Sequence, residues 1–244
     1  MKKRIFYYLA TLLIAFSNAI FAQENLNFSN LGFENWDLFH GYGYTSPDIV
    51  TTEYKVNSPH HDARHSINAV NGFDVNTLSK LRFIPEGESY SVRLGNSNNG
   101  SQSEKLAYTF TVNSENVKGS IYYKYAVVFQ SSKIDKDSYV QPKFKINIYL
   151  NDELLEEESY KVNASVDNLE FNLVSLPNRL IKWKDWTTVS FDLSDFNIND
   201  QIRLEFENYD CAIGRSFGYT YLVTNNMDPN NIITGGLIQK TMED

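Results

Sequence analysis

The sequence is poor in cysteine, in proline and in positive charge. Its 244 residues contain one cysteine, Cys211, and six prolines. A single thiol cannot close a bridge within the chain, so we expect the fold to depend on its hydrophobic core. Lysine and arginine number 22 against 30 aspartates and glutamates, a formal net charge of −8. Nucleic-acid binding needs clustered cations, and this balance argues against it.

Long hydrophobic runs are also absent after the N-terminus. Three cations at positions 2–4 precede an apolar stretch at 5–16 and a small residue, Ala22. This order predicts a secretory signal peptide, residues 1–22, cleaved after Ala22. The stretch is short for a bilayer-spanning helix, so we expect no membrane span in the mature chain. The protein is therefore expected to be exported, and then secreted or held at the cell surface.

Aromatic residues are abundant, with 16 Tyr, 16 Phe and 3 Trp, and they favour strands. Apolar and polar side chains alternate with a period of two, which is typical of half-buried strands. No stretch has a sustained helical period. The pattern therefore predicts an all-β fold, a single antiparallel β-sandwich. The clear strands are 90–94, 106–112, 121–129, 144–150, 189–193, 202–206 and 217–223, with weaker ones at 160–163 and 171–174.

The chain divides by composition into four parts. Residues 1–22 are the signal peptide, 23–30 a short polar leader, 31–224 the sandwich domain and 225–244 a flexible tail. Within the domain, residues 41–76 are rich in turn-forming residues. We expect a long irregular loop there, with one short strand at 49–54.

Several residues are candidates for metal binding or catalysis. His61, Asp62 and His65 form a dense ligand-type cluster, which is either a metal site or a polar loop. Cys211 is either a buried structural thiol or a nucleophile. Calcium prefers carboxylate and carbonyl oxygens, and Glu34 with Asp210 are the candidates for a structural Ca²⁺ site that joins the ends of the domain.

Ligand binding is predicted from rings and polar groups in loops. Tyr42 and Tyr44 lie in a glycine-rich segment, where their rings are expected to stack on sugars. A polar cluster of Arg64, His65, Arg93 and Asp210 is expected to be structural or ligand-gripping, two alternatives that the sequence leaves open. On strands, Tyr122 and Tyr149 occupy the polar face, which is either a binding surface or a face covered by the long loop.

A set of segments spread over the chain has a familiar wording: 30–36, 64–67, 89–96, 106–112, 125–128, 141–144, 186–189, 210–214 and 217–219. Together they resemble the N-terminal domain of large secreted surface proteins of Bacteroidetes, which often carry PKD repeats and gliding-motility-type C-terminal domains. The resemblance implies a jelly-roll, galactose-binding-like sandwich, similar to lectins and carbohydrate-binding modules, in an adhesin-type protein. It implies no catalytic residue for this chain.

Together these observations favour a non-catalytic binding or adhesion module, with a glycan or a surface protein as the expected partner. One alternative is an exported hydrolase acting on polysaccharide or peptide, which would need two facing carboxylates. The other is a structural spacer domain without a ligand.

Overall fold

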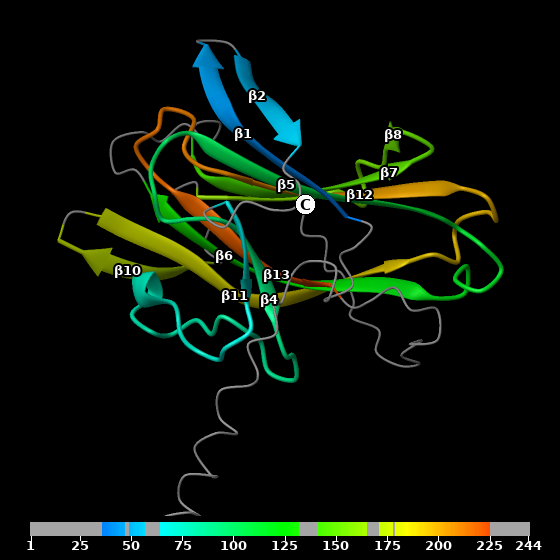
Figure 1. Cartoon of the computed structure of the whole chain (residues 1–244), viewed down its shortest axis with the longest axis horizontal. Helices are drawn as coiled ribbons and strands as arrows, with labels where there is room; N and C mark the ends of the chain where they lie inside the picture. Colours follow the sequence, from blue (N-terminus) through cyan, green and yellow to red (C-terminus); the bar gives the residue numbers. More distant parts are fainter. Residues whose placement is uncertain are drawn as a thin grey trace, which may run out of the picture. The chain divides into compact units, whose positions relative to one another are not determined.

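The structure is a computed structural model. It describes residues 36–46, 49–56, 64–131, 141–164, 171–177 and 179–224. Within these residues lie thirteen strands and one short 3-10 helix, η3 (Val75–Thr77). All the strand pairings given for them are antiparallel, and they form two sheets (Figure 1).

Sheet A has the strand order β2-β1-β5-β12-β7-β8, and β9 also pairs with β7. Sheet B has the order β10-β11-β6-β13-β4-β3. The strands of sheet A are β1 (Trp36–Ser46), β2 (Ile49–Val56), β5 (Gln102–Thr111), β7 (Lys143–Leu150), β8 (Glu153–Leu154), β9 (Tyr160–Asn163) and β12 (Gln201–Tyr209). Those of sheet B are β3 (His65–Asn68), β4 (Ser91–Gly95), β6 (Ser120–Ser131), β10 (Asn172–Leu176), β11 (Arg179–Asp192) and β13 (Gly218–Thr224).

Aromatic rings from the two sheets meet in the core between them. The ring of Tyr123 in β6 lies 5.1 Å from Phe206 in β12, and Tyr125 lies 5.4 Å from Phe144 in β7. Trp36 in β1 lies 5.7 Å from Phe206. Edge-to-face and tilted pairs at these separations are favourable beyond the area that they bury. The alternation in the sequence therefore places the aromatics where two inner faces interdigitate.

A second apolar cluster lies on the outer face of sheet B. Residues 73–85, called the covering segment below, cross that face (Figure 1). Leu81 of this segment is fully buried, and the ring of Phe83 lies 5.8 Å from Tyr221. The indole N–H of Trp186 in β11 donates to the carbonyl of Arg82 at 3.0 Å. This face of the sandwich is therefore closed by the chain itself.

Asp74 holds the covering segment in place. One of its carboxylate oxygens accepts hydrogen bonds from the hydroxyls of Tyr219 and Tyr221, at 2.7 Å each. The other accepts from the backbone N–H groups of Asn76 and Thr77, which caps η3. A single carboxylate thus orders the helix and fastens it to β13.

The structure confirms the predicted all-β antiparallel sandwich. The weak strand predicted at 160–163 is β9, and the one at 171–174 overlaps β10. The short strand predicted at 49–54 lies in β2. The long irregular loop predicted at 41–76 is wrong at His65 to Asn68, which form β3. It is also wrong at Gly41 to Ser46, which continue β1 and pair with β2. Antiparallel pairing stabilises this glycine-containing stretch as a hairpin. The predicted signal peptide, leader and tail lie outside the described residues.

The described part of the chain contains no helix with the length and apolarity needed to cross a membrane.

Candidate functional site

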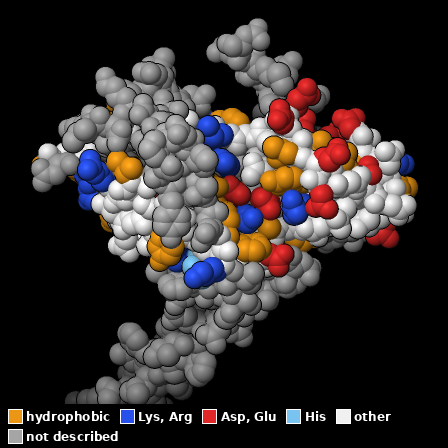
Figure 2. All heavy atoms as spheres, turned by 90° about the horizontal axis from the view of Figure 1, so that it is seen from above, with side chains coloured by type: hydrophobic (Ala, Val, Ile, Leu, Met, Phe, Trp, Pro, Cys, Tyr) orange, Lys and Arg blue, Asp and Glu red, His pale blue; other side chains and the backbone are white. Residues whose placement is uncertain are grey.

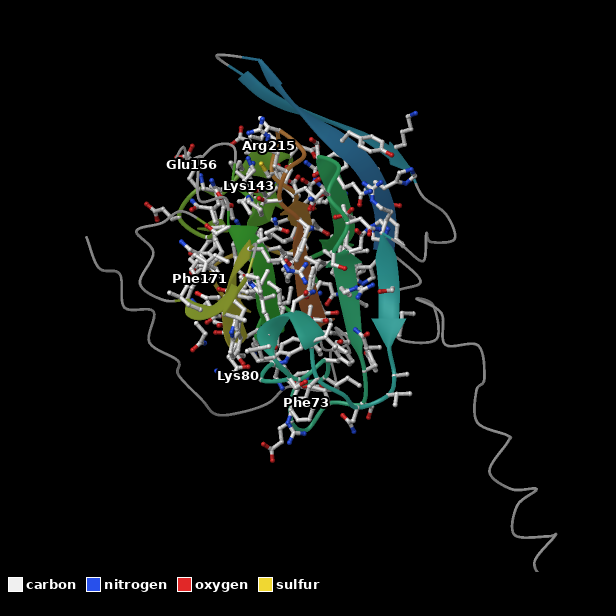
Figure 3. All side chains as sticks on the ribbon, turned by 90° about the vertical axis from the view of Figure 1, so that its left-hand side faces the viewer. Phe73, Lys80, Lys143, Glu156, Phe171 and Arg215 are labelled. Atoms are coloured by element: carbon white, nitrogen blue, oxygen red, sulfur yellow. The ribbon has the colours of Figure 1, made fainter. Side chains whose placement is uncertain are left out.

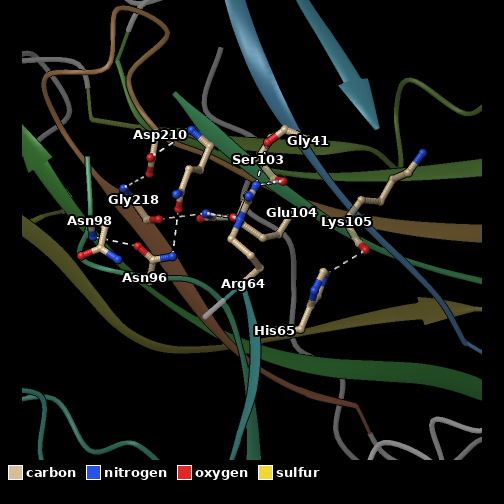
Figure 4. A network of polar contacts seen from close by, with 12 residues as sticks. Gly41, Arg64, His65, Asn96, Asn98, Ser103, Glu104, Lys105, Asp210 and Gly218 are labelled. Carbon is tan, nitrogen blue, oxygen red and sulfur yellow. Dashed lines mark hydrogen bonds and ion pairs between the residues drawn. The ribbon is translucent and has the colours of Figure 1, made fainter. Parts of the chain in front are cut away.

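Arg64 and Asp210, two of the predicted binding residues, belong to one buried polar network (Figure 4). The Arg64 guanidinium lies between the sheets. Its Nε is 2.5 Å from Glu104 Oε1, and its terminal nitrogen donates to the carbonyls of Gly41 at 2.6 Å and Ser103 at 2.9 Å. Asn208 donates to the second oxygen of Glu104 at 3.0 Å. Arg64 is the residue before β3 of sheet B, and its side chain therefore links the start of that strand to β1 and β5 of sheet A.

Asp210 ends the same network. Its two oxygens accept from the backbone N–H of Gly218 at 2.9 Å and of Gln102 at 3.0 Å. Burial raises the pKa of Asp210 to about 8, and the nearby Glu104 charge adds to this rise. Burial also raises the pKa of Glu104 to about 7, against the opposing effect of Arg64. Both groups are enclosed, which is the arrangement of a structural network.

The other predicted residues of the cluster lie apart from this network or beside it. Arg93 is on the outer face of sheet B, where its guanidinium lies 5.8 Å from the Tyr219 ring centroid. His65 is fully buried, with Nε2 3.4 Å from the carbonyl oxygen of Lys105. The structure therefore brings Arg64 and Asp210 together and separates Arg93 from them. Ligand binding by any of the four stays a prediction.

Tyr42 is the exposed neighbour of the network. Its side chain is 46% exposed, and the Arg64 guanidinium lies 5.2 Å from its ring centroid. Tyr42 and Tyr44 were expected in a loop, and that expectation is wrong, because both belong to β1 and pair with β2. The side chain of Tyr44 lies outside the described residues, so stacking of sugars on these two rings also stays a prediction.

The metal predictions fall largely outside the described residues, which exclude Glu34, His61 and Asp62. In the parts of the chain that are described, no group of three or more His, Cys, Asp or Glu side chains is placed to hold a metal ion. Cys211 is fully buried. The calcium site with Glu34 and Asp210 stays a prediction.

The outer face of sheet A carries a set of rings and charges that the sequence analysis did not assemble. We call it the sheet A platform. In the space-filling view toward this sheet, basic, acidic and hydrophobic side chains are intermixed (Figure 2). Its members come from six strands: Phe39, Tyr54, Lys105, Lys143, Lys145, Tyr149, Lys161, Arg203, Glu205, Glu207 and Tyr209.

One row of the platform crosses five paired strands. Directly opposed residues in an antiparallel sheet point to the same face. The register gives the row Phe39, Lys105, Glu207, Lys145 and Lys161 in order across the sheet. Glu207 thus lies between Lys105 and Lys145, and Lys145 lies beside a second lysine, Lys161. The Lys105 ammonium lies 4.7 Å from the Phe39 ring centroid. The row places its charges beside an aromatic ring.

In the neighbouring row, two tyrosines are separated by two small residues. Its members in register are Tyr54, Gly41, Ser103, Tyr209 and Lys143. Strands lie about 4.8 Å apart, so Tyr54 and Tyr209 start three strands away from each other. Their ring centroids are nevertheless 6.5 Å apart in an edge-to-face pair. Gly41 and Ser103 between them leave the room for both rings to lean together.

A third group surrounds Glu205. Its Oε1 is 3.4 Å from the Lys105 ammonium and 3.5 Å from Arg203 Nε. The Arg203 guanidinium also lies 4.3 Å from the Tyr149 ring centroid, a cation–π contact. Burial raises the pKa of Tyr149, and the charges of Glu205 and Glu207 raise it further. Glu205 is thus held between two cations, one of which also lies over a ring.

The platform is partly enclosed rather than loosely solvated. Glu205, Glu207 and Tyr209 are 7%, 6% and 7% exposed, although their side chains point outward. The tyrosine hydroxyl donates to Glu207. The alternation along β12 alone would predict a solvated face for the two glutamates, and the structure shows that they are buried instead. Long lysine, arginine and tyrosine side chains from adjacent strands cover them, as amphipathic side chains do.

No known family profile matches the chain, and no curated protein matches it. The solved structures that resemble it do so at low identity. A bacteriophage CBA120 tailspike protein 4 enzymatically active domain is 11% identical over 82% of this chain and 21% of its own, with a TM-score of 0.33. A structure described for promiscuous carbohydrate-binding modules of the β-sandwich superfamily is 9% identical over 82% and 59%, with a TM-score of 0.35. A Caldicellulosiruptor saccharolyticus module, CBM27-1, in complex with mannohexaose is 13% identical over 82% and 92%, with a TM-score of 0.32.

The chain thus spans about a fifth of the tailspike chain and 59% of the promiscuous module. At these TM-scores and identities the likenesses assign no family and no ligand to this chain.

Proposed function

We propose that this protein is a non-catalytic glycan-binding module and that the sheet A platform is its binding surface. The observation that carries the proposal is the gathering, on one sheet face, of four aromatic rings that each lie against a cation. Two carboxylates lie among them: Glu205 pairs with Lys105 and Arg203, and Glu207 accepts from the Tyr209 hydroxyl. A sugar has the same duality, because its ring presents apolar C–H faces and its edge presents hydroxyls. Tyrosine meets both needs with an apolar body and a polar tip.

Preorganisation supports the same proposal. The rings of Tyr54 and Tyr149 are half-buried, and each lies against a cation, Lys105 at 4.8 Å and Arg203 at 4.3 Å. Side chains that are already fixed lose little rotamer freedom when a ligand arrives. Glu205 and Glu207 hold the surrounding cations and the Tyr209 hydroxyl from rigid strand positions, which place groups more accurately than loops do.

The test compares matched tyrosines on the two outer faces. Tyr149→Ala and Arg203→Ala alter the platform, whereas Tyr122→Ala removes an equally half-buried tyrosine from sheet B. The purified domain is screened on a glycan array, and the affinity for each bound glycan is then measured by calorimetry. We expect about tenfold weaker binding for each platform variant, the equivalent of about 1.4 kcal/mol, and no change for Tyr122→Ala.

Binding that disappears equally in all three variants would point to a folding defect or a site elsewhere, and would overturn the proposal. So would a wild-type domain that binds no glycan. Tyr42→Ala is a further arm, because a loss confined to that variant would move the site to the strand end above Arg64.

The proposal includes export to the cell surface or the medium. The charged start, the apolar stretch at 5–16 and Ala22 support it. Mass spectrometry of protein recovered from the culture medium and the cell surface is expected to find Gln23 as the first residue. Recovery of the intact N-terminus from the cytosol alone would contradict this part.

A further inference from the structure

One corner of the sheet A platform has an excess of positive charge. Lys143 and Lys145 lie on β7, and Lys161 on β9 is the register partner of Lys145. These three residues are called the lysine corner below. Lys143 points to the same face, because it pairs with Tyr209 in β12. The whole chain carries a formal charge of −8, so a group of three adjacent lysines differs in sign from the chain as a whole.

The lysine corner is not neutralised within the described parts of the chain. Among the described residues no carboxylate forms an ion pair with Lys143, Lys145 or Lys161. The nearest platform acid in register is Glu207, and it already accepts from the Tyr209 hydroxyl. By contrast, Lys105 in the same row approaches Glu205. The corner therefore presents three cations that no described carboxylate holds in an ion pair.

An aromatic ring fixes two of these cations. The Lys143 ammonium lies 4.9 Å and the Lys145 ammonium 5.3 Å from the Tyr209 ring centroid. Cation–π contacts at these distances are attractive, and Tyr209 is itself buried. Two ammonium groups held against one ring form a fixed pair rather than two mobile surface chains.

We propose that the lysine corner binds the anionic substituent of an acidic polysaccharide, a carboxylate or a sulfate, whose sugar rings lie along the rest of the sheet A platform. This inference rests on the proposed function and names its ligand class. The lysines neutralise the acid, and Tyr54 and Tyr149 contact the ring faces.

The glutamates beside the lysine corner favour a glycan over other polyanions. A nucleic acid or an anionic membrane presents closely spaced negative charges, and these would meet Glu205 and Glu207 unfavourably. A polysaccharide separates its acidic groups by neutral, hydroxyl-bearing rings. This spacing matches a surface on which a cationic corner adjoins partnered carboxylates.

The electrostatics of Lys143 agree with this role. Burial, together with repulsion from Lys145 and Lys161 and against the opposing effect of Glu207, lowers the pKa of Lys143 to about 8. A bound anion would relieve the repulsion among the three ammonium groups.

The experiment uses pairs of polymers that differ in charge alone. Polygalacturonate is compared with its methyl ester, and dextran sulfate with dextran, by affinity electrophoresis and calorimetry at low and high salt. The proteins are wild type, a variant with Lys143→Gln, Lys145→Gln and Lys161→Gln together, and Lys80→Gln. Lys80 is an exposed lysine of the covering segment, and it lies on the other side of the sandwich from Lys143 (Figure 3).

The expected result is selective binding of one charged polymer, about tenfold weakened in the triple variant and unchanged in Lys80→Gln. Binding of polygalacturonate would identify a carboxylate as the ligand group, and binding of dextran sulfate would identify a sulfate. Equal affinity for charged and neutral forms, or acidic binding that the triple variant retains, would overturn the inference and leave the proposed function intact. Binding of neither form, with an empty glycan array, would overturn both. Equal capture by duplex DNA or phosphatidylserine vesicles would also overturn the inference, because it would show non-specific charge attraction.

Discussion

The two outer faces of this sandwich both carry tyrosines that point away from the central core, and they surround these rings differently. Sheet B buries its outward tyrosines, Tyr219 and Tyr221, under the covering segment and ties their hydroxyls to Asp74. Sheet A leaves its outward tyrosines beside cations, with Arg203 against Tyr149 and Lys143 near Tyr209. Tyrosine content alone does not distinguish a core from a binding face. The covering segment makes the distinction: it buries Tyr219 and Tyr221 on sheet B, whereas Tyr149 on sheet A stays half-buried.

The largest expected effect separates the faces by stability. Leu81→Ala removes a fully buried side chain from the cluster on sheet B. We expect a loss of about 2–5 kcal/mol in the free energy of unfolding, measured by urea denaturation. Tyr149→Ala on the sheet A platform is the matched comparison, and we expect about 1 kcal/mol there because its ring is half-buried. Equal losses at the two positions would break the comparison.

The next test concerns the link between the covering segment and β13. In wild type, both carboxylate oxygens of Asp74 accept hydrogen bonds, one from backbone N–H groups and the other from tyrosine hydroxyls. Asp74→Asn replaces one of these acceptors by an amide nitrogen, which is a donor. We expect about 1–3 kcal/mol of destabilisation and faster hydrogen exchange at residues 73–85. Exchange that stays unchanged there while other regions open would show that Asp74 does not hold this segment. Glu205→Gln is the counterpart on sheet A, and it should leave exchange at 73–85 as in wild type.

The smallest effect is the titration of Lys143. Its pKa is lowered to about 8, below the usual value of about 10.4 in an unfolded chain. Between these values the unfolded chain binds the additional proton, so this residue makes stability rise with pH in that window. NMR titration of the Lys143 side-chain carbon should show the midpoint near 8, with Lys80 as the exposed control. The same midpoint for both lysines would show that the lysine corner is not electrostatically coupled.

Much of the fold could be predicted from the sequence, because period-two alternation is a local property. It predicted β5, β6, β7 and β12 from residues within each strand. It was wrong at Gly41 to Ser46, because glycines suggest a loop unless the pairing partner is known. Antiparallel pairing with β2 stabilises this stretch as a strand, although its residues have a low intrinsic propensity for one.

The sheet A platform could not be predicted in the same way. Lys105 meets Glu205 across 100 positions in the chain, and Phe39 meets Lys105 across 66. The sequence contained one usable signal, the run of polar outward residues at 203, 205 and 207 that ends in Tyr209. Its burial depends on long side chains from other strands, and their identity follows only from the sheet order.

The pair of small residues under the two leaning tyrosines has a consequence for the edge of sheet A. Tyr54 belongs to the outermost strand, β2, and its ring reaches Tyr209 above Gly41 and Ser103. Sliding β2 by a two-residue step would carry that ring off the gap. The Tyr54–Tyr209 contact therefore fixes the register of β2, a strand at the edge of the sheet. Edge strands otherwise tend to shift register or to pair with a strand of another molecule.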